Sequence, residues 1–192
     1  FSTLTSSGWR MGLPREAIYA QAIGEDEANS MPSKYLGLVG AEVWGGFGER
    51  SWRAHLEYAD TACAFYESEP QFGCAYRNAI YTDGYQYRDR SVGHAIDGDS
   101  QQLAMGFMLV NPGGDSWEFA LQDADINRES ANPVHSVSID AGSIRSADLY
   151  HRREFAGGDL RIGVGYQERE DDVTGQDTED VRGYLQWTRR IN

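Results

Sequence analysis

One polar segment, 57–100, holds most of the side chains that could bind a ligand, because tyrosines alternate there with arginines and aspartates. A tyrosine ring stacks on the apolar C–H face of a sugar, while arginine and aspartate bind the surrounding hydroxyl groups. The segment therefore predicts a carbohydrate-binding surface, although the same tyrosines could instead pack it into a compact lid. The side chains expected to contact the ligand are Tyr81, Tyr85, Tyr87, Arg88, Arg90, Asp97 and Asp99.

The two cysteines of the chain, Cys63 and Cys74, lie in the same segment. An isolated pair in one polar loop predicts a disulfide that closes a small ring, and a reduced or metal-bound pair is the alternative. Their spacing is too wide for a redox CxxC motif. A disulfide of this kind would contribute about 3 kcal/mol through loop entropy. It also indicates an oxidising location outside the cytoplasm.

Signatures of catalysis and of cofactor binding are missing from the sequence. It has no P-loop, GxSxG, HExxH or zinc-type cysteine pattern, and its histidines are scattered. We therefore expect no enzyme, no cofactor and no metal, although a glycosidase needs only two suitably spaced carboxylates. Asp97 and Asp99 do not fit the twelve-residue EF-hand pattern, and capping a turn is the alternative role for them.

The charge balance and the hydropathy pattern narrow the class of protein further. With 30 acidic and 17 basic residues, the net charge of -13 argues against nucleic-acid binding, which needs clustered Lys and Arg. No apolar run is long enough for a transmembrane helix. A barrel strand, in contrast, needs only about 9–11 residues with apolar side chains at alternate positions. The chain begins with Phe1 rather than Met, which predicts a segment upstream of it.

Alternation of apolar and polar residues with a period of two predicts strands rather than helices over most of the chain. Membrane barrels and soluble β-sandwiches share this alternation, so the alternation alone does not separate the two classes. The expected strands are 8–13, 16–24, 34–45, 51–61, 101–110, 116–126, 144–155, 159–168 and 180–191.

The lengths of the links between these strands favour a barrel, because short and long links take turns along the chain. Outer-membrane barrels have tight turns on the periplasmic side and long loops outside, whereas a sandwich has no reason to sort its loops. The short links are 13–15, 46–50, 111–115 and 156–158. The long links are 25–33, 60–100, 127–143 and 171–180.

The tryptophans favour the same class, since each lies near a short link or near the C-terminus. In a barrel these positions share one level, the periplasmic interface, where an aromatic girdle is expected. Nine strands cannot close a bacterial barrel, which has an even number of strands, so the chain is predicted to be part of a larger one. The residues concerned are Trp9, Trp44, Trp52, Trp117 and Trp187.

Several motifs in and beside the long polar segment resemble the capsule assembly protein Wzi family. They are Tyr58-Ala59-Asp60-Thr61, Tyr76 to Tyr81, Gly84-Tyr85-Gln86-Tyr87-Arg88, Gly93-His94, and the acidic pair Asp97 and Asp99. The resemblance implies the C-terminal part of an outer-membrane barrel of about eighteen strands. It also implies a lectin without enzymatic activity that attaches or organises capsular polysaccharide or another exopolysaccharide.

The sequence therefore predicts an all-β chain, a single domain over 1–192, in a transmembrane antiparallel up-and-down β-barrel of the Gram-negative outer membrane. The segment 60–100 is expected to be an extracellular loop. The expected partners are capsular or exopolysaccharide, outer-membrane lipid and lipopolysaccharide. The alternatives are a secreted carbohydrate-active β-sandwich and a porin-like channel, whose selectivity would be set by Arg53, Glu57, Arg161 and Arg182.

Overall fold

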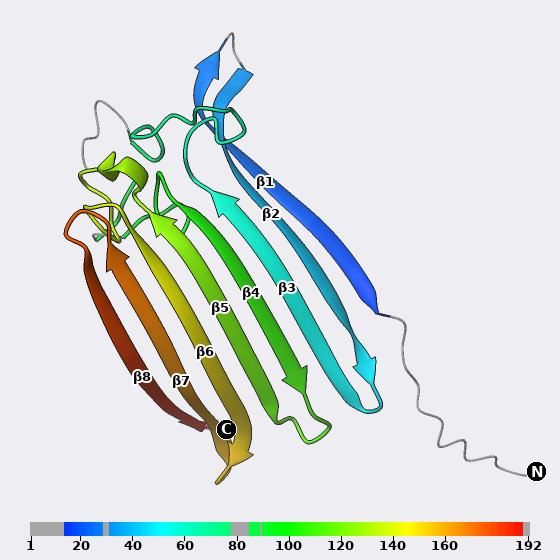
Figure 1. Cartoon of the computed structure of the whole chain (residues 1–192). Coiled ribbons are helices and arrows are strands. Elements are labelled where there is room, and N and C mark those ends of the chain that lie inside the picture. Colours follow the sequence, from blue (N-terminus) through cyan, green and yellow to red (C-terminus); the bar gives the residue numbers. More distant parts are fainter. Residues whose placement is uncertain (1–13, 29–30, 78–84, 89, 190–192) are drawn as a thin grey trace, which may run out of the picture.

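The chain forms one antiparallel sheet of eight strands that follow one another in sequence order (Figure 1). A computed structural model describes residues 14–28, 31–77, 85–88 and 90–189. The all-β, up-and-down architecture predicted above is confirmed, and the expected strand 8–13 lies outside the described residues. The strands are β1 (Arg15–Ala28), β2 (Met31–Phe47), β3 (Arg50–Asp60), β4 (Gln101–Val110), β5 (Ser116–Ile126), β6 (Gly142–Phe155), β7 (Gly158–Asp171) and β8 (Gln176–Arg189).

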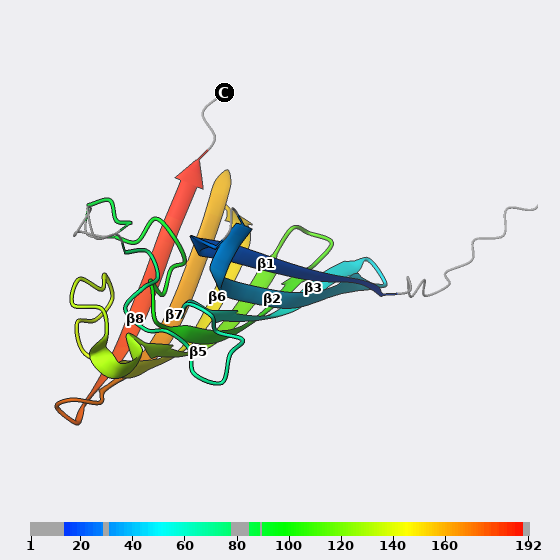
Figure 2. The ribbon, with the colours of Figure 1, turned by 90° about the horizontal axis from the view of Figure 1, so that it is seen from above.

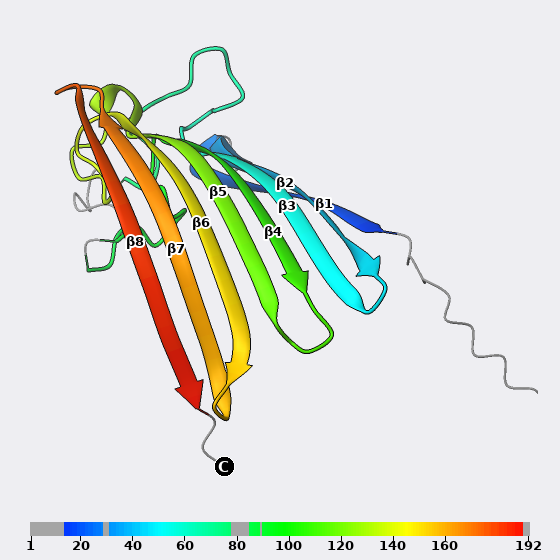
Figure 3. The same ribbon diagram turned by 60° about the horizontal axis from the view of Figure 1, so that its bottom comes forward.

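The connections are sorted between the two ends of the sheet. Tight turns join β2 to β3, β4 to β5 and β6 to β7 at one end, and the β3–β4 and β5–β6 connections gather at the other (Figure 1). The β6–β7 turn has left-handed φ at Ala156 (51°) and Gly157 (71°), as a two-residue type I′ hairpin requires. Seen from the loop end, the sheet is a curved wall, and its strands run side by side in one tilted layer (Figures 2 and 3). Within the described ranges, no helix has the length and apolar composition needed to cross a membrane.

The prediction of a long link is wrong at two of the four places, 25–33 and 171–180. β1 and β2 stay paired as far as Ala28 and Met31, and β7 and β8 stay paired as far as Asp171 and Gln176. The polar composition of 25–33 and 171–180 therefore marks where the apolar face of the sheet stops, not where backbone pairing stops. Polar strands can continue to pair because the ladder satisfies the backbone N–H and C=O groups whatever side chains they carry.

The register gives the sheet an apolar face, on which many large side chains are exposed. Directly paired residues point to the same side, so the apolar positions of successive strands form continuous rows. On this face Ile18 is 83% exposed and Leu185 is 73% exposed. Trp52, Trp117 and Trp187 lie on the same face near the tight turns, as predicted. Trp44 instead pairs with Arg53 on the opposite face, so it cannot belong to an apolar girdle.

The opposite, polar face is shaped by large side chains that lie over glycines of the neighbouring strand. The ring of Tyr150 covers Gly163, and the ring of His55 covers Gly106. A Cβ atom at Gly163 would lie 2.2 Å from the Tyr150 ring, closer than any real Cβ contact. Each of these pairs is also a directly opposed pair in the register, so the missing side chain on one strand makes room for the ring on the next.

The Gly163→Val substitution should therefore destabilise the fold by about 1–3 kcal/mol, because Tyr150 must leave its place over β7. The measurement is the free energy of unfolding of the purified protein in denaturant. Gly183→Val is the matched control, because Gly183 is a strand glycine with nothing within 4 Å of the position of a Cβ. Equal losses in the two variants would show that strand propensity, not the contact with Tyr150, decides the effect.

Candidate functional site

The long connection 61–100 is anchored where it leaves and rejoins the sheet. The Thr61 N–H donates to the Ser100 carbonyl (2.8 Å), and the Asp99 N–H donates to the Thr61 carbonyl (3.1 Å). The Thr61 Oγ1 also accepts a hydrogen bond from the Ser100 N–H (3.0 Å). The pairing of β3 with β4 thus continues into the connection, and both of its ends are held at a defined place above the sheet.

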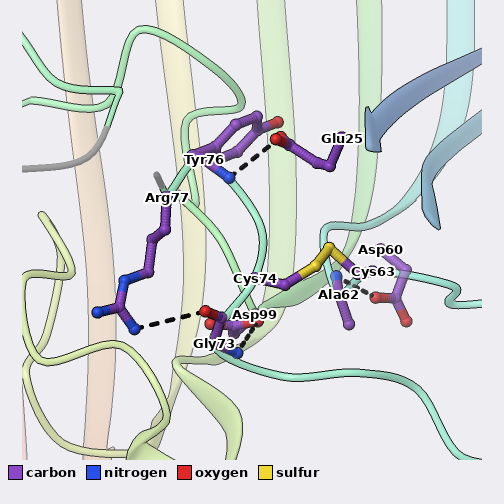
Figure 4. The surroundings of a disulfide bond; sticks show 9 residues. All are labelled: Glu25, Asp60, Ala62, Cys63, Gly73, Cys74, Tyr76, Arg77 and Asp99. Atoms are coloured by element: carbon purple, nitrogen blue, oxygen red, sulfur yellow. Dashed lines mark hydrogen bonds between the residues drawn. A yellow bond between two sulfur atoms is a disulfide. The ribbon is translucent and has the colours of Figure 1, made fainter. Parts of the chain in front are cut away.

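The first part of this connection, 63–74, is closed by the predicted disulfide between Cys63 and Cys74 (Figure 4). The two Cα atoms lie 6.1 Å apart, within the ordinary range for a disulfide. Cys63 and Gln71 also exchange two backbone hydrogen bonds, of 3.1 and 2.8 Å. Cys63 is fully buried against Leu36 of β2 and Ala75. These contacts hold the disulfide-closed ring, 63–74, against the sheet.

Tyr76 joins the second part of the connection to the extended tips of β1 and β2. Its backbone N–H donates to the Glu25 carboxylate of β1 (3.0 Å; Figure 4), and its hydroxyl oxygen accepts from the His94 N–H (3.2 Å). Its ring covers Gly93, where a Cβ would lie 2.5 Å from it. Tyr76 is only 8% exposed, and burial raises the pKa of its hydroxyl. Tyr76 thus supports the connection from within.

A groove of about 870 Å³ opens between the β1–β2 tips and this supported segment. The Tyr85 ring at its edge is 59% exposed and lies beside the Tyr76 ring, with 6.5 Å between centroids. Burial lowers the pKa of His94, so this imidazole is neutral at pH 7. Rings, amides, a carboxylate and a guanidinium together suit a ligand rich in hydroxyl groups. The lining includes Gln21, Glu25, Tyr76, Arg77, Tyr85 and His94.

Four of the predicted ligand-binding residues, Tyr85, Tyr87, Arg88 and Arg90, are exposed near this groove. The Arg88 guanidinium lies over the Tyr87 ring, 5.3 Å from its centroid. Tyr87 and Arg90 exchange backbone hydrogen bonds of 2.9 and 3.3 Å, which form a tight turn that presents all three side chains. Tyr81 lies outside the described residues. Binding of a ligand by these residues stays a prediction.

Asp97 and Asp99 are placed differently, because their side chains are 1% and 0% exposed. The Asp97 carboxylate accepts the Gly98 N–H (2.9 Å) and the Ser136 N–H (2.7 Å), and so joins the two long connections. The Asp99 Oδ1 accepts the Gly73 N–H (2.9 Å), while its Oδ2 has no partner among the described residues. Neither carboxylate offers an exposed oxygen to a ligand, so any contribution of theirs to binding passes through the fold of the connections.

The β5–β6 connection contributes residues that the sequence did not single out. The Asn127 Nδ2 donates to three carbonyls of its own connection, those of Asn132, Ser138 and Ile139. Ser100 links this connection to the other one, because its Oγ accepts the Asn127 N–H (3.0 Å). The hydrogen bond between Asn127 and Ser100 joins residues 27 positions apart, so no local motif of the sequence indicates it.

His135 is held between the two connections in one tautomer. Its Nδ1 accepts the N–H groups of Val137 and Ser138, both at 3.2 Å, so its proton is on Nε2 and points at the Gly98 carbonyl (3.0 Å). Burial lowers the pKa of His135, in agreement with a neutral ring. Among the described residues, no three His, Cys, Asp or Glu side chains form a group that could hold a metal ion.

An ion pair ties the β5–β6 connection to the end of β3. The Arg128 guanidinium lies 2.5 Å from the Asp60 carboxylate, and their side chains are 19% and 6% exposed. The same guanidinium lies over the ring of Phe72, 5.1 Å from its centroid. This pair, the shared Ser100 and the Asp97 carboxylate make the two long connections a single unit.

Three of the four charged residues that the channel hypothesis invoked form ion pairs, and the fourth, Glu57, accepts a hydrogen bond from Tyr19. Each of the four residues named for selectivity makes a hydrogen bond or an ion pair with another strand. Arg53 reaches the adjacent strand β2, and the other three reach across one intervening strand. The polar face therefore presents closely paired charges, not an unbalanced charge of one sign. The pairs are Arg53–Glu42 (2.6 Å), Tyr19–Glu57 (3.0 Å), Arg161–Glu118 (2.8 Å) and Arg182–Asp148 (3.5 Å).

Comparison with known proteins gives one family and one similar solved structure. A family model described as "Capsule assembly protein Wzi" matches residues 9–180. The similar structure is Wzi of Escherichia coli, an outer-membrane protein involved in group 1 capsule assembly and described as a carbohydrate-binding β-barrel. It shares 23% sequence identity with the chain at a TM-score of 0.73; the match covers 96% of this chain and 40% of that one. No curated protein matches the chain.

The buried carboxylate of Asp99, whose Oδ2 has no hydrogen-bond partner among the described residues, predicts an unusual dependence on pH. Burial raises the pKa of Asp99 from 3.8 to about 6, so the folded connection binds this proton more tightly than the unfolded one. The charge therefore lowers local stability progressively as the pH rises from 3.8 to 6. Asp99→Asn should give no gain below pH 4 and a gain of up to about 3 kcal/mol above pH 7. The gain is measured by hydrogen exchange of the amides of 61–100, with the rates of the variant and of the parent compared at each pH.

Asp97→Asn is the matched control, because both Asp97 oxygens already accept backbone N–H groups. That variant should lose stability at pH 7. Titration of His94 and His135 affects the parent and the variant alike, so it cancels in the difference. If the difference in local stability between Asp99→Asn and the parent stays constant from pH 4 to 8, the buried charge of Asp99 does not destabilise the connection, and the prediction is wrong.

Proposed function

Because the chain belongs to the capsule assembly protein Wzi family, we propose that it is part of a non-enzymatic outer-membrane β-barrel that binds capsular polysaccharide or another exopolysaccharide. It spans less than half of the similar solved barrel, so the complete protein is the unit that would perform this function. The observation that carries the proposal is the groove at the loop end, with its exposed ring and guanidinium groups, on a sheet whose other face is apolar.

The apolar face supports a location in the membrane. A bilayer is the environment in which exposed rows such as Ile162, Val164 and Leu185 cost no free energy. Trp117 and Trp187 lie at the tight-turn end of the apolar face, at a level where amphipathic rings are favoured. A charged row that runs from Asp123 through Arg145, Glu168 and Glu179 bounds the apolar rows toward the loops.

This placement puts the tight turns on the periplasmic side and the groove outside the cell, where a surface polysaccharide is found. Retention would come from several weak contacts acting together. Tyr85 and Tyr87 would stack on sugar rings, and Arg88 and Arg90 would bind hydroxyl or acidic groups. We assign Asp97 and Asp99 to holding the two connections in shape.

Two features support binding over selective conduction. Arg53, Arg161 and Arg182 on the polar face are each in an ion pair, as described above. The connections also cover the loop end of that face, where Ile96 and Val137 pack against Ala124, Ile126 and Ile144 of the sheet. Lipid and lipopolysaccharide are the other partners that the apolar face implies.

The double substitution Tyr85→Ala with Arg88→Ala should weaken polysaccharide binding about thirtyfold, since an exposed aromatic ring and a guanidinium each contribute about 1 kcal/mol at a binding surface. The measurement is retention of purified capsular polysaccharide by the complete protein in detergent. Heat-modifiable mobility on a gel should be unchanged, because neither side chain is part of the sheet.

The matched control is Tyr66→Ala. Tyr66 has almost the same exposed fraction as Tyr85, 60% against 59%, but it lies in the disulfide-closed part of the connection, away from the groove. It should leave retention unchanged. Full retention by the double variant, with normal heat-modifiable mobility, would place the binding surface elsewhere.

A further inference from the structure

The disulfide-closed ring, 63–74, carries three aromatic residues that do not line the groove, Phe65, Tyr66 and Phe72, and the first two are in contact with each other. The Phe65 ring lies against Gly37 of β2, where a Cβ would be only 2.1 Å from its Cζ. Gly37 shares a face with Val39, which is 48% exposed on the apolar face. Phe65 therefore lies against the apolar face of the sheet, whereas Leu36 and Leu38, which line the groove, point to the polar face.

Tyr66 continues this cluster outward. Its ring meets the Phe65 ring edge-on, with 5.6 Å between centroids and 85° between planes, and it is 60% exposed. The pair is held in place, because the Cys63–Gln71 hydrogen bonds and the disulfide fix the backbone on either side of it. An exposed aromatic pair on a fixed support has little conformational entropy to lose when it binds.

The level of the pair on the sheet indicates its partner. In the register, Gly37 opposes Asp60 and Asp60 opposes Gln101, so the row at Gly37 is polar. The adjacent row toward the tight turns is apolar, with Val39, Tyr58 and Leu103. Phe65 thus lies one repeat, about 7 Å along the strand, beyond the last apolar row. This is the level at which hydrocarbon gives way to headgroups and at which aromatic side chains concentrate.

We propose that Phe65 and Tyr66 form an interfacial anchor, which inserts into the headgroup layer of the membrane that surrounds the apolar face. The anchor is continuous with the apolar rows, and it rests on the membrane placement given under the proposed function. Glu67 and Glu69, which follow in the same turn and are exposed, limit its depth, because a carboxylate does not enter hydrocarbon. Two parts of the connection thus have different partners: residues 63–74 contact lipid, and the part around Tyr85 contacts the polysaccharide.

Photo-crosslinking tests the anchor. The complete protein, with p-benzoylphenylalanine in place of Tyr66, is reconstituted into vesicles of dioleoylphosphatidylcholine and irradiated. Mass spectrometry then measures the phospholipid adduct on the peptide that contains position 66. The same replacement of Leu56, on the apolar face, is the positive control, and that of Tyr87 is the negative control. We expect the yield at position 66 to lie within about threefold of that at 56 and at least tenfold above that at 87.

The outcomes separate the anchor from the membrane placement. An adduct at 56 without one at 66 overturns the anchor and leaves the placement intact. No adduct at 56 overturns the placement, and the anchor with it. If added capsular polysaccharide is crosslinked at 66 in place of phospholipid, the aromatic pair belongs to the ligand surface. With Cys63→Ser and Cys74→Ser together, the yield at 66 should fall severalfold while the yield at 56 does not change.

Discussion

Alternation with a period of two residues is the constraint on which both faces of this sheet depend. Since successive side chains point to opposite sides, one register assigns every residue of a strand to a face. The apolar rows and the paired charges of the polar face are therefore two results of a single choice. A slip by one residue between β3 and β4 would place Arg53 among the apolar side chains and Leu56 among the charges. The glycines opposite His55 and Tyr150 reinforce the choice, because each large ring finds room only over its own partner.

The loop end follows a different principle, in which buried polar groups take the place of an apolar core. Ser100, Asn127 and His135 satisfy backbone groups of two connections at once, and almost every buried atom among them has a partner. Such a network is rigid when complete, since losing one member leaves others unsatisfied in a poorly solvated place. A rigid network also explains how polar loops without a large hydrophobic cluster can present Tyr85 and Arg88 in a defined arrangement.

The sequence predicted the features that depend on local patterns. The two-residue periodicity of apolar side chains predicted the strands, the two cysteines predicted the disulfide, and the motifs around Tyr85 indicated the family. It misjudged the ends of the strands near 25–33 and 171–180, because polarity reports the surroundings of a side chain and not backbone pairing. It also treated Asp97 and Asp99 as surface groups, since a carboxylate buried by a distant connection looks the same in sequence as an exposed one. The hydrogen bonds of Asn127 to Ser100 and of His135 to Gly98 depend on tertiary contacts, which carry no local signal.

The ion pair between Arg128 and Asp60 has a consequence for how the chain assembles. Alternation cannot distinguish the native register from a slip of two residues, because each side chain would return to its own face. Such a slip anywhere between β3 and β5 would carry Arg128 about 7 Å away from Asp60. It would leave a buried carboxylate without its partner, at a cost of about 3–5 kcal/mol. The pair joins residues 68 positions apart, so it can form only after three strands have aligned. The pair therefore opposes a slip of two residues, which would leave both faces of the sheet unchanged.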